Sequence, residues 1–186
     1  FLPYATSLRM SNIGYQSDAQ AGIAINLNSL DEYSDCLLNA TRTPHPAYQQ
    51  IGVKVDGEYR QLNTNLLQIE NEYYAPIRPK RVARSGEKPT TALRQRGVEY
   101  IEIRSIDLDP FLPVGIDETG IMFLELLLLY CLFDTSPPLE KPEKERLRAN
   151  HDRIVLHGRK HDMSIITEIG EQSVATAGKT LLNRLQ

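Results

Sequence analysis

The most regular alternation of apolar and polar positions lies at residues 99–108, Glu-Tyr-Ile-Glu-Ile-Arg-Ser-Ile-Asp-Leu. Successive side chains of a strand point to opposite faces, so this pattern predicts a strand with two distinct sides. Ile101 and Ile103 are expected to face one way and to be buried, whereas Glu102 and Arg104 face a cleft or solvent. A carboxylate beside a guanidinium suits a ligand that combines a metal ion with an anion.

Two further stretches alternate in a similar way. Residues 5–15 begin as a strand pattern that breaks at Gly14. Residues 65–74 predict a second strand, with Glu70 and Glu72 on its polar side. These two carboxylates are candidates for a second metal ligand or for a general acid or base.

Turn residues mark two more segments. Residues 53–59 predict a β-hairpin, because their Asp-Gly pair supplies the positive φ angles of a tight type I′ turn. Residues 76–81, Pro-Ile-Arg-Pro-Lys-Arg, carry two prolines that interrupt strand hydrogen bonding. A loop or an irregular edge strand is therefore expected there.

Capping residues locate the helices. Ser29 and Glu32 form a capping box, which predicts a helix from there to about Thr41. A short basic helix is predicted around residues 91–96, and a charged, exposed helix over residues 140–151. Strands interspersed with helices make the fold class α+β.

A longer helix is predicted from the cap Asp117 to about Phe133. Its apolar run, residues 121–133, is interrupted by Glu125 and is shorter than the roughly 20 residues that cross a bilayer. We therefore expect a buried helix and no membrane association.

Composition narrows the class of protein. With 186 residues, 41% hydrophobic and 24% charged, the chain has the make-up of a globular domain, which excludes disorder and collagen-like structure. The net charge of −3 gives no overall attraction to nucleic acid. Cys36 and Cys131 lie in apolar or helical stretches without metal-ligand spacing, so we expect buried thiols in a reducing compartment, the cytoplasm.

The ends of the sequence suggest a segment of a longer protein. The first residue is Phe1 and not methionine, no secretory signal opens the chain, and the last residues lie within a helical pattern. Residues 1–186 are accordingly expected to be a single segment, truncated at both ends.

A basic run follows the second predicted strand and contains Arg78, Lys80, Arg81 and Arg84. Arginine forks bind phosphate oxygens, lysine adds a point charge, and the prolines reduce the entropy lost on ordering the loop. Taken alone, the run is better explained as a solvated surface loop, because charge runs usually are. His157 and His161 have helical spacing but lack the glutamate of a zinc protease motif, so both are expected at the surface.

The pair of Glu102 and Arg104 also has two interpretations. It is either a surface ion pair or part of a half-buried cleft in which the carboxylate coordinates Mg²⁺ facing a triphosphate. Glycine-rich phosphate loops and a nucleophile with its base are not recognisable in the sequence.

Three blocks, residues 5–15, 67–81 and 99–105, resemble the proteobacterial glutamate-cysteine ligases in sequence, order and spacing. The similarity extends through the predicted Asp117 helix and residues 153–160. It implies ATP- and Mg²⁺-dependent joining of the γ-carboxylate of L-glutamate to the amine of L-cysteine. The reaction would pass through γ-glutamyl phosphate and is the first step of glutathione synthesis.

The resemblance also implies roles for individual residues. Glu102 would be a metal ligand, and Arg104 would meet the transferred phosphoryl group and the γ-carboxyl group. Arg9 would contact a substrate carboxylate, while Tyr15 and Tyr74 would line the cysteine subsite. From charge chemistry alone, the ATP phosphates are assigned to Lys80, Arg81 and Arg84.

The implied fold is related to that of glutamine synthetase, with a curved, mainly antiparallel sheet and flanking helices. Most metal-binding carboxylates of the family would precede Phe1, so residues 1–186 are expected to be inactive without the remainder of the same enzyme. Two alternatives stay open: a related ligase with another amine acceptor, and a non-catalytic anion-binding module built on the basic run.

Overall fold

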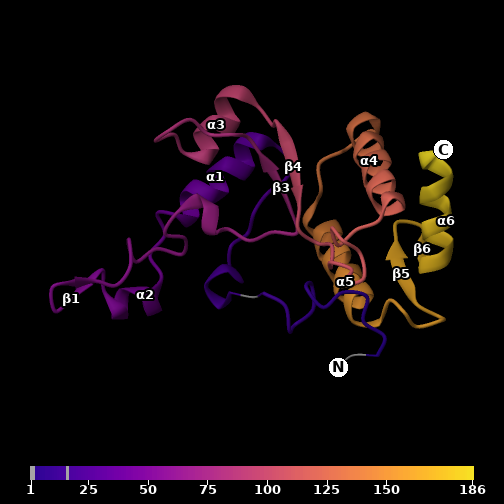
Figure 1. The fold of residues 1–186 in the computed structure, drawn as a ribbon, viewed down its shortest axis with the longest axis horizontal. Helices are drawn as coiled ribbons and strands as arrows, with labels where there is room; N and C mark the ends of the chain where they lie inside the picture. The colour runs from indigo at the N-terminus through magenta and orange to yellow at the C-terminus, as the bar shows by residue number, and fades with distance from the viewer. Residues whose placement is uncertain (1–2, 16) are drawn as a thin grey trace. The chain divides into compact units, whose positions relative to one another are not determined.

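The computed structural model describes residues 3–15 and 17–186 (Figure 1). The chain forms two compact units, here called the central unit and the terminal unit. The central unit is Gln16–Ser105, and the terminal unit combines Phe1–Tyr15 with Ile106–Gln186. Helices and short antiparallel strand pairs occur in each, which confirms the α+β class.

The elements of the central unit follow one another as η1 (Asp18–Gln20), α1 (Leu30–Ala40), α2 (Pro46–Ile51), β1 (Lys54–Val55), β2 (Glu58–Tyr59), η2 (Glu70–Glu72), β3 (Ile77–Lys80), α3 (Pro89–Arg96) and β4 (Tyr100–Ile103). Helix α1 starts as predicted, because the Ser29 hydroxyl accepts a hydrogen bond of 3.1 Å from the Glu32 amide. Thr41 caps its C-terminal end.

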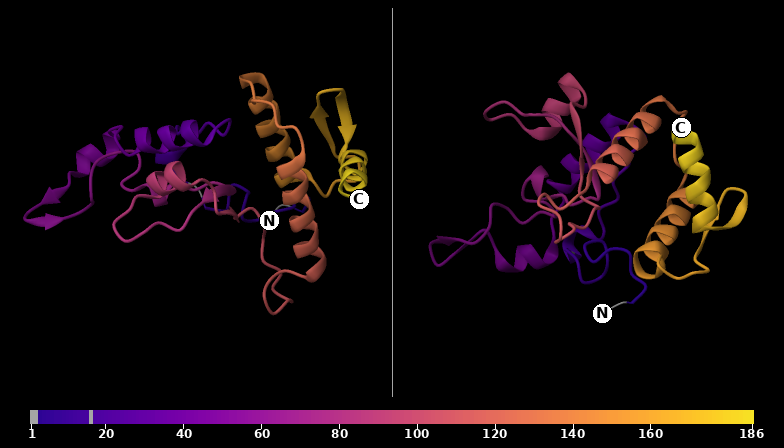
Figure 2. Two further views of the ribbon diagram at one scale, coloured as in Figure 1. Left: turned by 90° about the horizontal axis from the view of Figure 1, so that it is seen from above. Right: turned by 45° about the vertical axis from the view of Figure 1, so that its right-hand side comes forward.

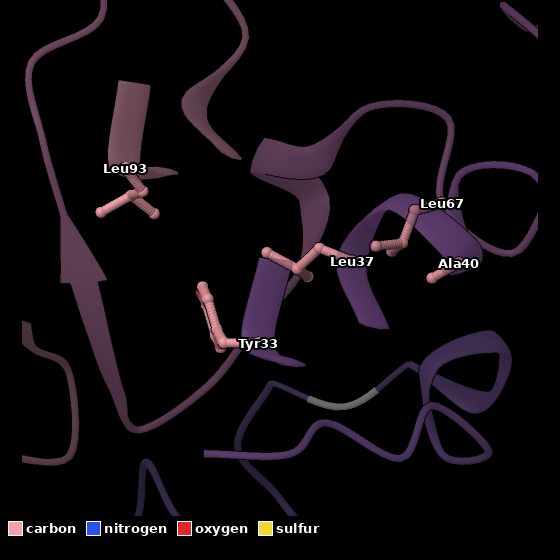
Figure 3. Packing of buried hydrophobic residues seen from close by; sticks show 5 residues of the cluster. All are labelled: Tyr33, Leu37, Ala40, Leu67 and Leu93. Atoms are coloured by element: carbon pink, nitrogen blue, oxygen red, sulfur yellow. The ribbon is translucent and has the colours of Figure 1, made fainter. Parts of the chain in front are cut away.

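A small core forms where α1 packs against α3 and the segment before η2. Tyr33, Leu37 and Ala40 of α1 meet Leu67 and Leu93, all at most 4% exposed (Figure 3). Leu67 is fully buried, so its apolar surface is removed from water completely. This core holds α1, α3 and the segment before η2 together.

Strands β3 and β4 pair antiparallel and form a two-stranded ribbon. Arg78 lies opposite Glu102, and Pro79 lies opposite Ile101. The irregular edge strand, one of the two forms expected for residues 76–81, is therefore the one observed. The alternation predicted for residues 101–104 also holds in this register, although β4 ends at Ile103. The expected burial of Ile101 is wrong within this chain, because 40% of that residue is exposed.

The predicted hairpin at residues 53–59 is confirmed. Strands β1 and β2 pair around Asp56 and Gly57, whose φ angles of 51° and 85° are both positive, as a type I′ turn requires. The Asp-Gly pair is the local reason for the turn.

The strand predicted for residues 65–74 is wrong. Apart from an isolated β-bridge between Asn65 and Pro44, the regular structure of this segment is limited to the 3₁₀ helix η2, which follows bends. Side chains here hydrogen-bond to nearby backbone groups, so these groups do not pair with another strand. The Glu72 carboxylate accepts from the Gln68 amide at 2.6 Å, and the Asn63 amide group donates to the Gln68 carbonyl at 2.9 Å.

The terminal unit contains α4 (Glu118–Phe133), α5 (Lys141–His157), β5 (Ser164–Thr167), β6 (Gly170–Ser173) and α6 (Val174–Leu185). The β5–β6 hairpin packs against α5 and α6 (Figure 2). Asn150 of α5 joins the hairpin through two bonds with Ile166, donating to its carbonyl at 2.7 Å and accepting from its amide at 2.9 Å. Helix α5 extends beyond the predicted residues 140–151.

The strand predicted for residues 5–15 is also wrong. Within this segment the chain makes successive turns, because Asp107 accepts hydrogen bonds from the Ser7 hydroxyl and from the amides of Leu8 and Arg9 at 2.6, 2.6 and 3.2 Å. The break at Gly14 is real, since a Cβ atom there would lie 1.8 Å from the Arg9 carbonyl oxygen. A carboxylate about 100 residues away thus decides this local structure.

Helix α4 has the predicted bounds and the predicted Asp117 cap, at 2.7 Å from the Gly120 amide. Its predicted burial is wrong within this chain, because none of its residues is buried. The predicted burial of both cysteines is wrong as well: Cys131 on α4 is exposed, and Cys36 is half-buried. None of the helices in the described part of the chain is long and apolar enough to cross a membrane.

Candidate functional site

The polar face is the side of the β3–β4 ribbon that carries charged groups. Strand alternation and register place Arg78, Lys80, Tyr100 and Glu102 on it, and Arg104 follows directly after β4 on the same side. Three cations therefore surround one carboxylate. This excess of positive charge favours an anionic ligand.

The two oxygens of Glu102 have different surroundings. Oε1 accepts a hydrogen bond of 3.0 Å from Arg104. Oε2 lies 3.7 Å from Nε of Arg78, is buried, and has no hydrogen-bond partner. Hydrogen bonding from Arg104 is the largest influence on the carboxyl group and, against the opposing effect of burial, lowers the pKa of Glu102. Oε2 is thus an ionised oxygen with unused lone pairs.

Arg78 is the most deeply buried charge of the polar face. Only 4% of the residue is exposed, and its Nη1 donates to the Tyr73 carbonyl at 2.8 Å. Burial raises the pKa of Tyr33, and both the charge of Arg78 and its hydrogen bond to Tyr33 oppose that rise. Burial also raises the pKa of Tyr73 to about 12. Both phenols stay neutral near Arg78.

Arg104 and Lys80 complete the polar face. The Arg104 guanidinium lies 5.9 Å from the ring centre of Tyr74, within range of a cation–π interaction. Burial and the nearby charge of Arg78 lower the pKa of Lys80, while Glu102 opposes them. Lys80 thus adds a third cationic group beside Glu102.

A cavity of about 250 Å³ adjoins the ribbon. Tyr33, Leu37 and Leu93 contribute apolar surface to it, while Lys80 and Arg81 contribute positive charge. The cavity therefore offers both an apolar and a cationic surface to a ligand.

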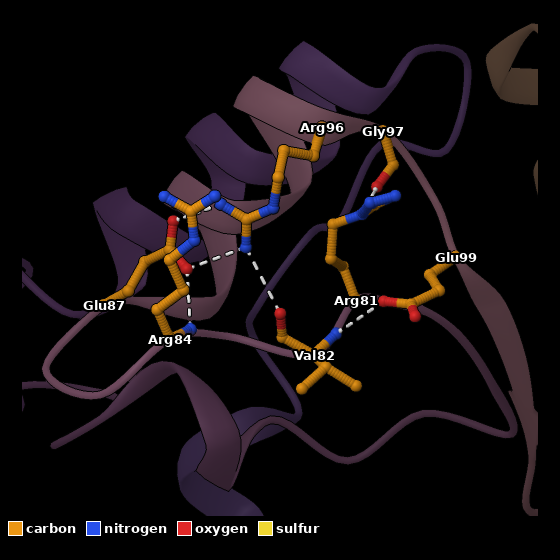
Figure 4. A network of polar contacts seen from close by, with 7 residues as sticks. All are labelled: Arg81, Val82, Arg84, Glu87, Arg96, Gly97 and Glu99. Carbon is orange, nitrogen blue, oxygen red and sulfur yellow. Dashed lines mark hydrogen bonds and ion pairs between the residues drawn. The ribbon is translucent and has the colours of Figure 1, made fainter.

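Hydrogen bonds brace the loop of residues 81–88, which leads from β3 to α3 (Figure 4). Arg81 donates from Nε to the Gly97 carbonyl at 2.8 Å, and the Val82 amide donates to Glu99 at 3.1 Å. Both contacts connect the start of the loop to the segment that precedes β4. Arg81 therefore has a structural contact in addition to its place at the cavity.

An ion pair braces the other end of this loop. Arg96 of α3 binds both carboxylate oxygens of Glu87 at 2.7 and 2.8 Å, and the Arg84 amide also donates to Glu87 at 2.8 Å (Figure 4). The hydrogen bonds from Arg96 and then from the Arg84 backbone lower the pKa of Glu87 to about 2. The loop is thus anchored at both ends.

The predicted site residues differ in where the structure places them. Glu102, Arg104 and Tyr74 come together at the polar face, and Lys80 and Arg81 line the cavity. Arg84 is exposed and lies outside the cavity lining. Arg9 and Tyr15 belong to the terminal unit, where the Arg9 amide binds Asp107 and 59% of Tyr15 is exposed.

Sequence reasoning missed the central position of Arg78. Arg78 was recognised only as one cation of the basic run. Alternation along residues 77–80 carries the missing signal, because it places Arg78 on the same side as Lys80. Pro79 obscured that signal by favouring a loop.

Glu70 and Glu72, considered for metal or acid–base chemistry, both make structural hydrogen bonds. Glu70 is 6% exposed and accepts from the amide and the hydroxyl of Thr90 at 2.9 and 2.8 Å. Glu72 accepts from Gln68 as described above. Within residues 3–15 and 17–186, no three histidine, cysteine or acidic side chains come together as a metal site, so Glu102 Oε2 stands as a single candidate ligand.

The geometry defines a cation-rich, phosphate-compatible site with one carboxylate oxygen that lacks a hydrogen-bond partner. Residues 1–154 match the family model described as glutamate-cysteine ligase. The chain belongs to the glutamate-cysteine ligase family, which confirms the resemblance found in its sequence.

Two curated relatives illustrate the extent of the similarity. The glutamate–cysteine ligase of Shewanella oneidensis is 53% identical over 176 residues, covering 95% of this chain and 34% of the relative. That of Baumannia cicadellinicola is 48% identical over 188 residues, covering 100% of this chain and 36% of the relative. The chain thus spans about a third of the length of these relatives.

Solved structures extend the comparison to the fold. The glutamate–cysteine ligase of Francisella tularensis, determined in complex with AMP, matches 98% of this chain and 37% of its own with a TM-score of 0.89 and 37% identity. A bifunctional glutathione synthetase from Pasteurella multocida matches 97% of this chain and 19% of its own with a TM-score of 0.59 and 21% identity, a similarity of fold alone.

Proposed function

We propose that this chain contributes part of the active site of an ATP-dependent ligase that joins the γ-carboxylate of L-glutamate to the amine of L-cysteine. The observation that carries the proposal is the polar face, where three cations surround Glu102 and one of its oxygens lacks a hydrogen-bond partner. A carboxylate is a poor electrophile, so conversion of glutamate to γ-glutamyl phosphate makes amide formation feasible. Such phosphoryl transfer depends on positioning and charge neutralisation.

Glu102 fits the role of a Mg²⁺ ligand. Magnesium prefers oxygen ligands and is commonly held by one or two carboxylates together with substrate phosphates, so a single protein oxygen is compatible with a site. The bound ion would supply charge neutralisation for the phosphates. Arg104 is assigned to the transferred phosphoryl group and the γ-carboxyl group, both of which a planar guanidinium can bind in bidentate fashion.

The cavity supports a nucleotide-phosphate role for Lys80 and Arg81. Its volume of about 250 Å³ is below the roughly 300–1,000 Å³ of complete small-molecule sites, so it would hold only part of ATP. Nucleotide binding by the Francisella relative supports this assignment. Arg84 is retained as a third phosphate contact, although its contribution rests on charge alone.

The remaining roles follow from family membership. Tyr74 is assigned to the cysteine subsite beside Arg104, and the predicted substrate contacts of Arg9 and Tyr15 stay predictions. We assign the chain to a single segment of a catalytic domain with a fold related to glutamine synthetase, acting in the cytoplasm. Because it spans about a third of its relatives, we expect no γ-glutamylcysteine formation by residues 1–186 alone.

Glu102→Gln in the longer ligase polypeptide tests the proposal. The amide keeps the shape of the side chain and removes the anionic metal ligand. Phosphate release from ATP should require both glutamate and cysteine, and the variant should lower its rate by at least about 100-fold, as loss of an electrostatic contact to a transition state does. Glu58→Gln, on the exposed strand β2, is the matched control and should retain full activity.

Two results would contradict the proposal in different ways. Full turnover in Glu102→Gln would exclude a metal-binding role for Glu102. Turnover with other amines but not with cysteine, measured in a substrate panel, would favour the related carboxylate–amine ligase. Absence of any amine-dependent phosphate release would favour the non-catalytic anion-binding module.

A further inference from the structure

Arg78 lies at the centre of the polar face, and the function proposed above uses it only as one of three cations around Glu102. It stands directly across the ribbon from Glu102, and only 5% of its side chain is exposed. A guanidinium so deeply buried acts mainly through the groups that surround it. Its effect on a ligand is therefore expected to pass through Glu102.

The guanidinium of Arg78 is fixed by groups that belong to the packed part of the central unit. Nη1 donates to the Tyr73 carbonyl at 2.8 Å, just before β3. Tyr33, which is 3% exposed and part of the core, lines the same cavity as Arg78, whose charge opposes the rise in the pKa of the phenol. Because the guanidinium is planar, buried and fixed at Nη1, it presents Nε to Glu102 in a defined direction.

The distance from Arg78 Nε to Glu102 Oε2 is the informative feature. At 3.7 Å it exceeds the range of about 2.7–3.2 Å for such a hydrogen bond, yet both atoms are buried and have no other partner. Leaving buried polar atoms unpaired costs free energy, so their persistence indicates a use for at least one of them.

The other oxygen of Glu102 already has a hydrogen-bond partner. Oε1 accepts from Arg104 at 3.0 Å, so rotation of the carboxylate is restricted from that side. Arg78 supplies attraction to Oε2 without consuming its lone pairs in a hydrogen bond. The carboxylate is consequently held between two guanidinium groups, and Oε2 has no hydrogen-bond partner.

We propose that Arg78 is a positioning residue that orients the Glu102 carboxylate so that Oε2 binds the divalent cation. This proposal rests on the proposed function, because it takes Glu102 as a metal ligand. Partners that orient metal ligands typically contribute about 10–100-fold to metal affinity. Arg78 would act on the cation without contacting it.

Mn²⁺ binding to the longer ligase polypeptide tests this proposal. Mn²⁺ alone serves as the probe, and electron paramagnetic resonance measures the free ion without substrates or turnover. Arg78→Lys keeps the charge but loses the planar fork, and should weaken binding by about 10–100-fold while leaving KM for cysteine unchanged. Arg94→Lys, which alters an arginine paired with Asp35 between α3 and α1, should bind Mn²⁺ like the wild type.

The double variant Arg78→Lys/Glu102→Gln establishes whether Arg78 acts through Glu102. If it does, the double variant binds Mn²⁺ no more weakly than Glu102→Gln alone, because the effects of coupled residues are not additive. An additive loss would overturn the positioning role. Wild-type affinity in folded Arg78→Lys, with affinity lost in Glu102→Gln, would also overturn it while leaving the proposed function intact.

Wild-type affinity in Glu102→Gln would instead refute the metal-ligand assignment on which the proposal rests. Should Arg78→Lys fail to fold, as judged by circular dichroism, Tyr33→Phe is the second variant. It removes the polar hydroxyl from the cavity that Arg78 lines and preserves every charge, so it should loosen the guanidinium and weaken Mn²⁺ binding in the same direction. Unchanged binding in folded Tyr33→Phe would then overturn the proposal.

Discussion

Glu87 shows how one side chain fixes the loop of residues 81–88. Its carboxylate accepts two hydrogen bonds from Arg96 and one from the Arg84 amide, although it lies near the surface with 13% of the side chain exposed. A bidentate pair of this kind has a defined geometry that isolated surface ion pairs lack. Through it, the loop that follows the cationic strand β3 is fastened to α3.

The low pKa of Glu87 predicts a specific pH dependence of stability. Hydrogen bonding to Arg96 lowers the pKa of Glu87 from 4.5 to about 2, so the folded state favours the ionised form. The stabilisation is complete above the unfolded pKa of 4.5 and is lost as the pH falls towards the folded pKa of about 2. Glu87→Gln should therefore destabilise the protein at pH 7, and its difference from the wild type should shrink below pH 4.5.

Denaturant unfolding of the two proteins between pH 7 and pH 3 measures this difference in the free energy of unfolding. Glu58→Gln is the control, because its carboxylate is exposed on β2. A difference between Glu87→Gln and the wild type that stays constant throughout this pH range would show that the ion pair does not stabilise the fold.

At the scale of elements, Glu70 connects η2 to the start of α3. Its buried carboxylate accepts from the amide and the hydroxyl of Thr90, in the first turn of that helix. The first amides of a helix have no partner within the helix, and a carboxylate there also interacts favourably with the helix dipole. Glu70 thus caps a helix that begins about 20 residues further along the chain.

Glu70→Gln should lower the free energy of unfolding by about 1 kcal/mol or more, because hydrogen bonds to a charged group contribute about 1.5–3 kcal/mol each and those to a neutral group about 0.5–1.5 kcal/mol. The amide can still pair with both Thr90 groups, since the Thr90 hydroxyl can accept from its NH₂ group, so the loss comes from removing the negative charge. Urea unfolding measures the loss, and Gln95→Ala, at an exposed position of α3, is the control with an expected change near zero. An unchanged unfolding midpoint in Glu70→Gln would rule out the capping role.

Locally encoded elements were predictable, and elements fixed by distant contacts were not. The Ser29 cap, the Asp56-Gly57 turn and the Asp117 cap all act within four residues, and each was found where expected. The alternation at residues 101–104 likewise placed Glu102 beside Arg104 correctly. For residues 5–15, by contrast, the deciding group is Asp107, whose proximity no local pattern reveals.

The candidate site could be predicted only in part for the same reason. Alternation and family resemblance identified Glu102 and Arg104, but not the buried Arg78 that faces them from β3. Recognising Arg78 required the strand register, which Pro79 made difficult to anticipate. The structural use of Glu70 required knowing that Thr90 lies beside it.

At the scale of the whole molecule, the exposed apolar surface of α4 is the main departure from an ordinary monomeric domain. Ile121, Met122, Leu132 and Phe133 are 50, 55, 72 and 83% exposed. A helix that is hydrophobic all round is normally buried, and large exposed apolar patches mark interaction surfaces. The expectation that α4 is a buried helix was wrong for this chain, but it is consistent with burial in a longer ligase.

Lysine substitutions in α4 should therefore reduce exposed apolar surface in residues 1–186 alone but destabilise the longer ligase. In residues 1–186, Leu132→Lys/Phe133→Lys should decrease fluorescence of a dye that binds exposed apolar surface and should decrease self-association in light scattering. In the longer ligase, the same pair should lower the free energy of unfolding by at least about 2–5 kcal/mol, the cost of losing one large core side chain. Burial of the introduced charges would add to that loss.

Ile169→Lys provides the control in residues 1–186. Ile169 is 84% exposed but lies in the β5–β6 turn outside α4, so removing this single apolar side chain should change dye binding little. Equal stability of the longer ligase with and without the two α4 lysines would show that the helix surface stays exposed there. Loss of stability only in the longer polypeptide would establish that the remainder of the enzyme covers α4, because the substituted side chains are largely exposed within residues 1–186.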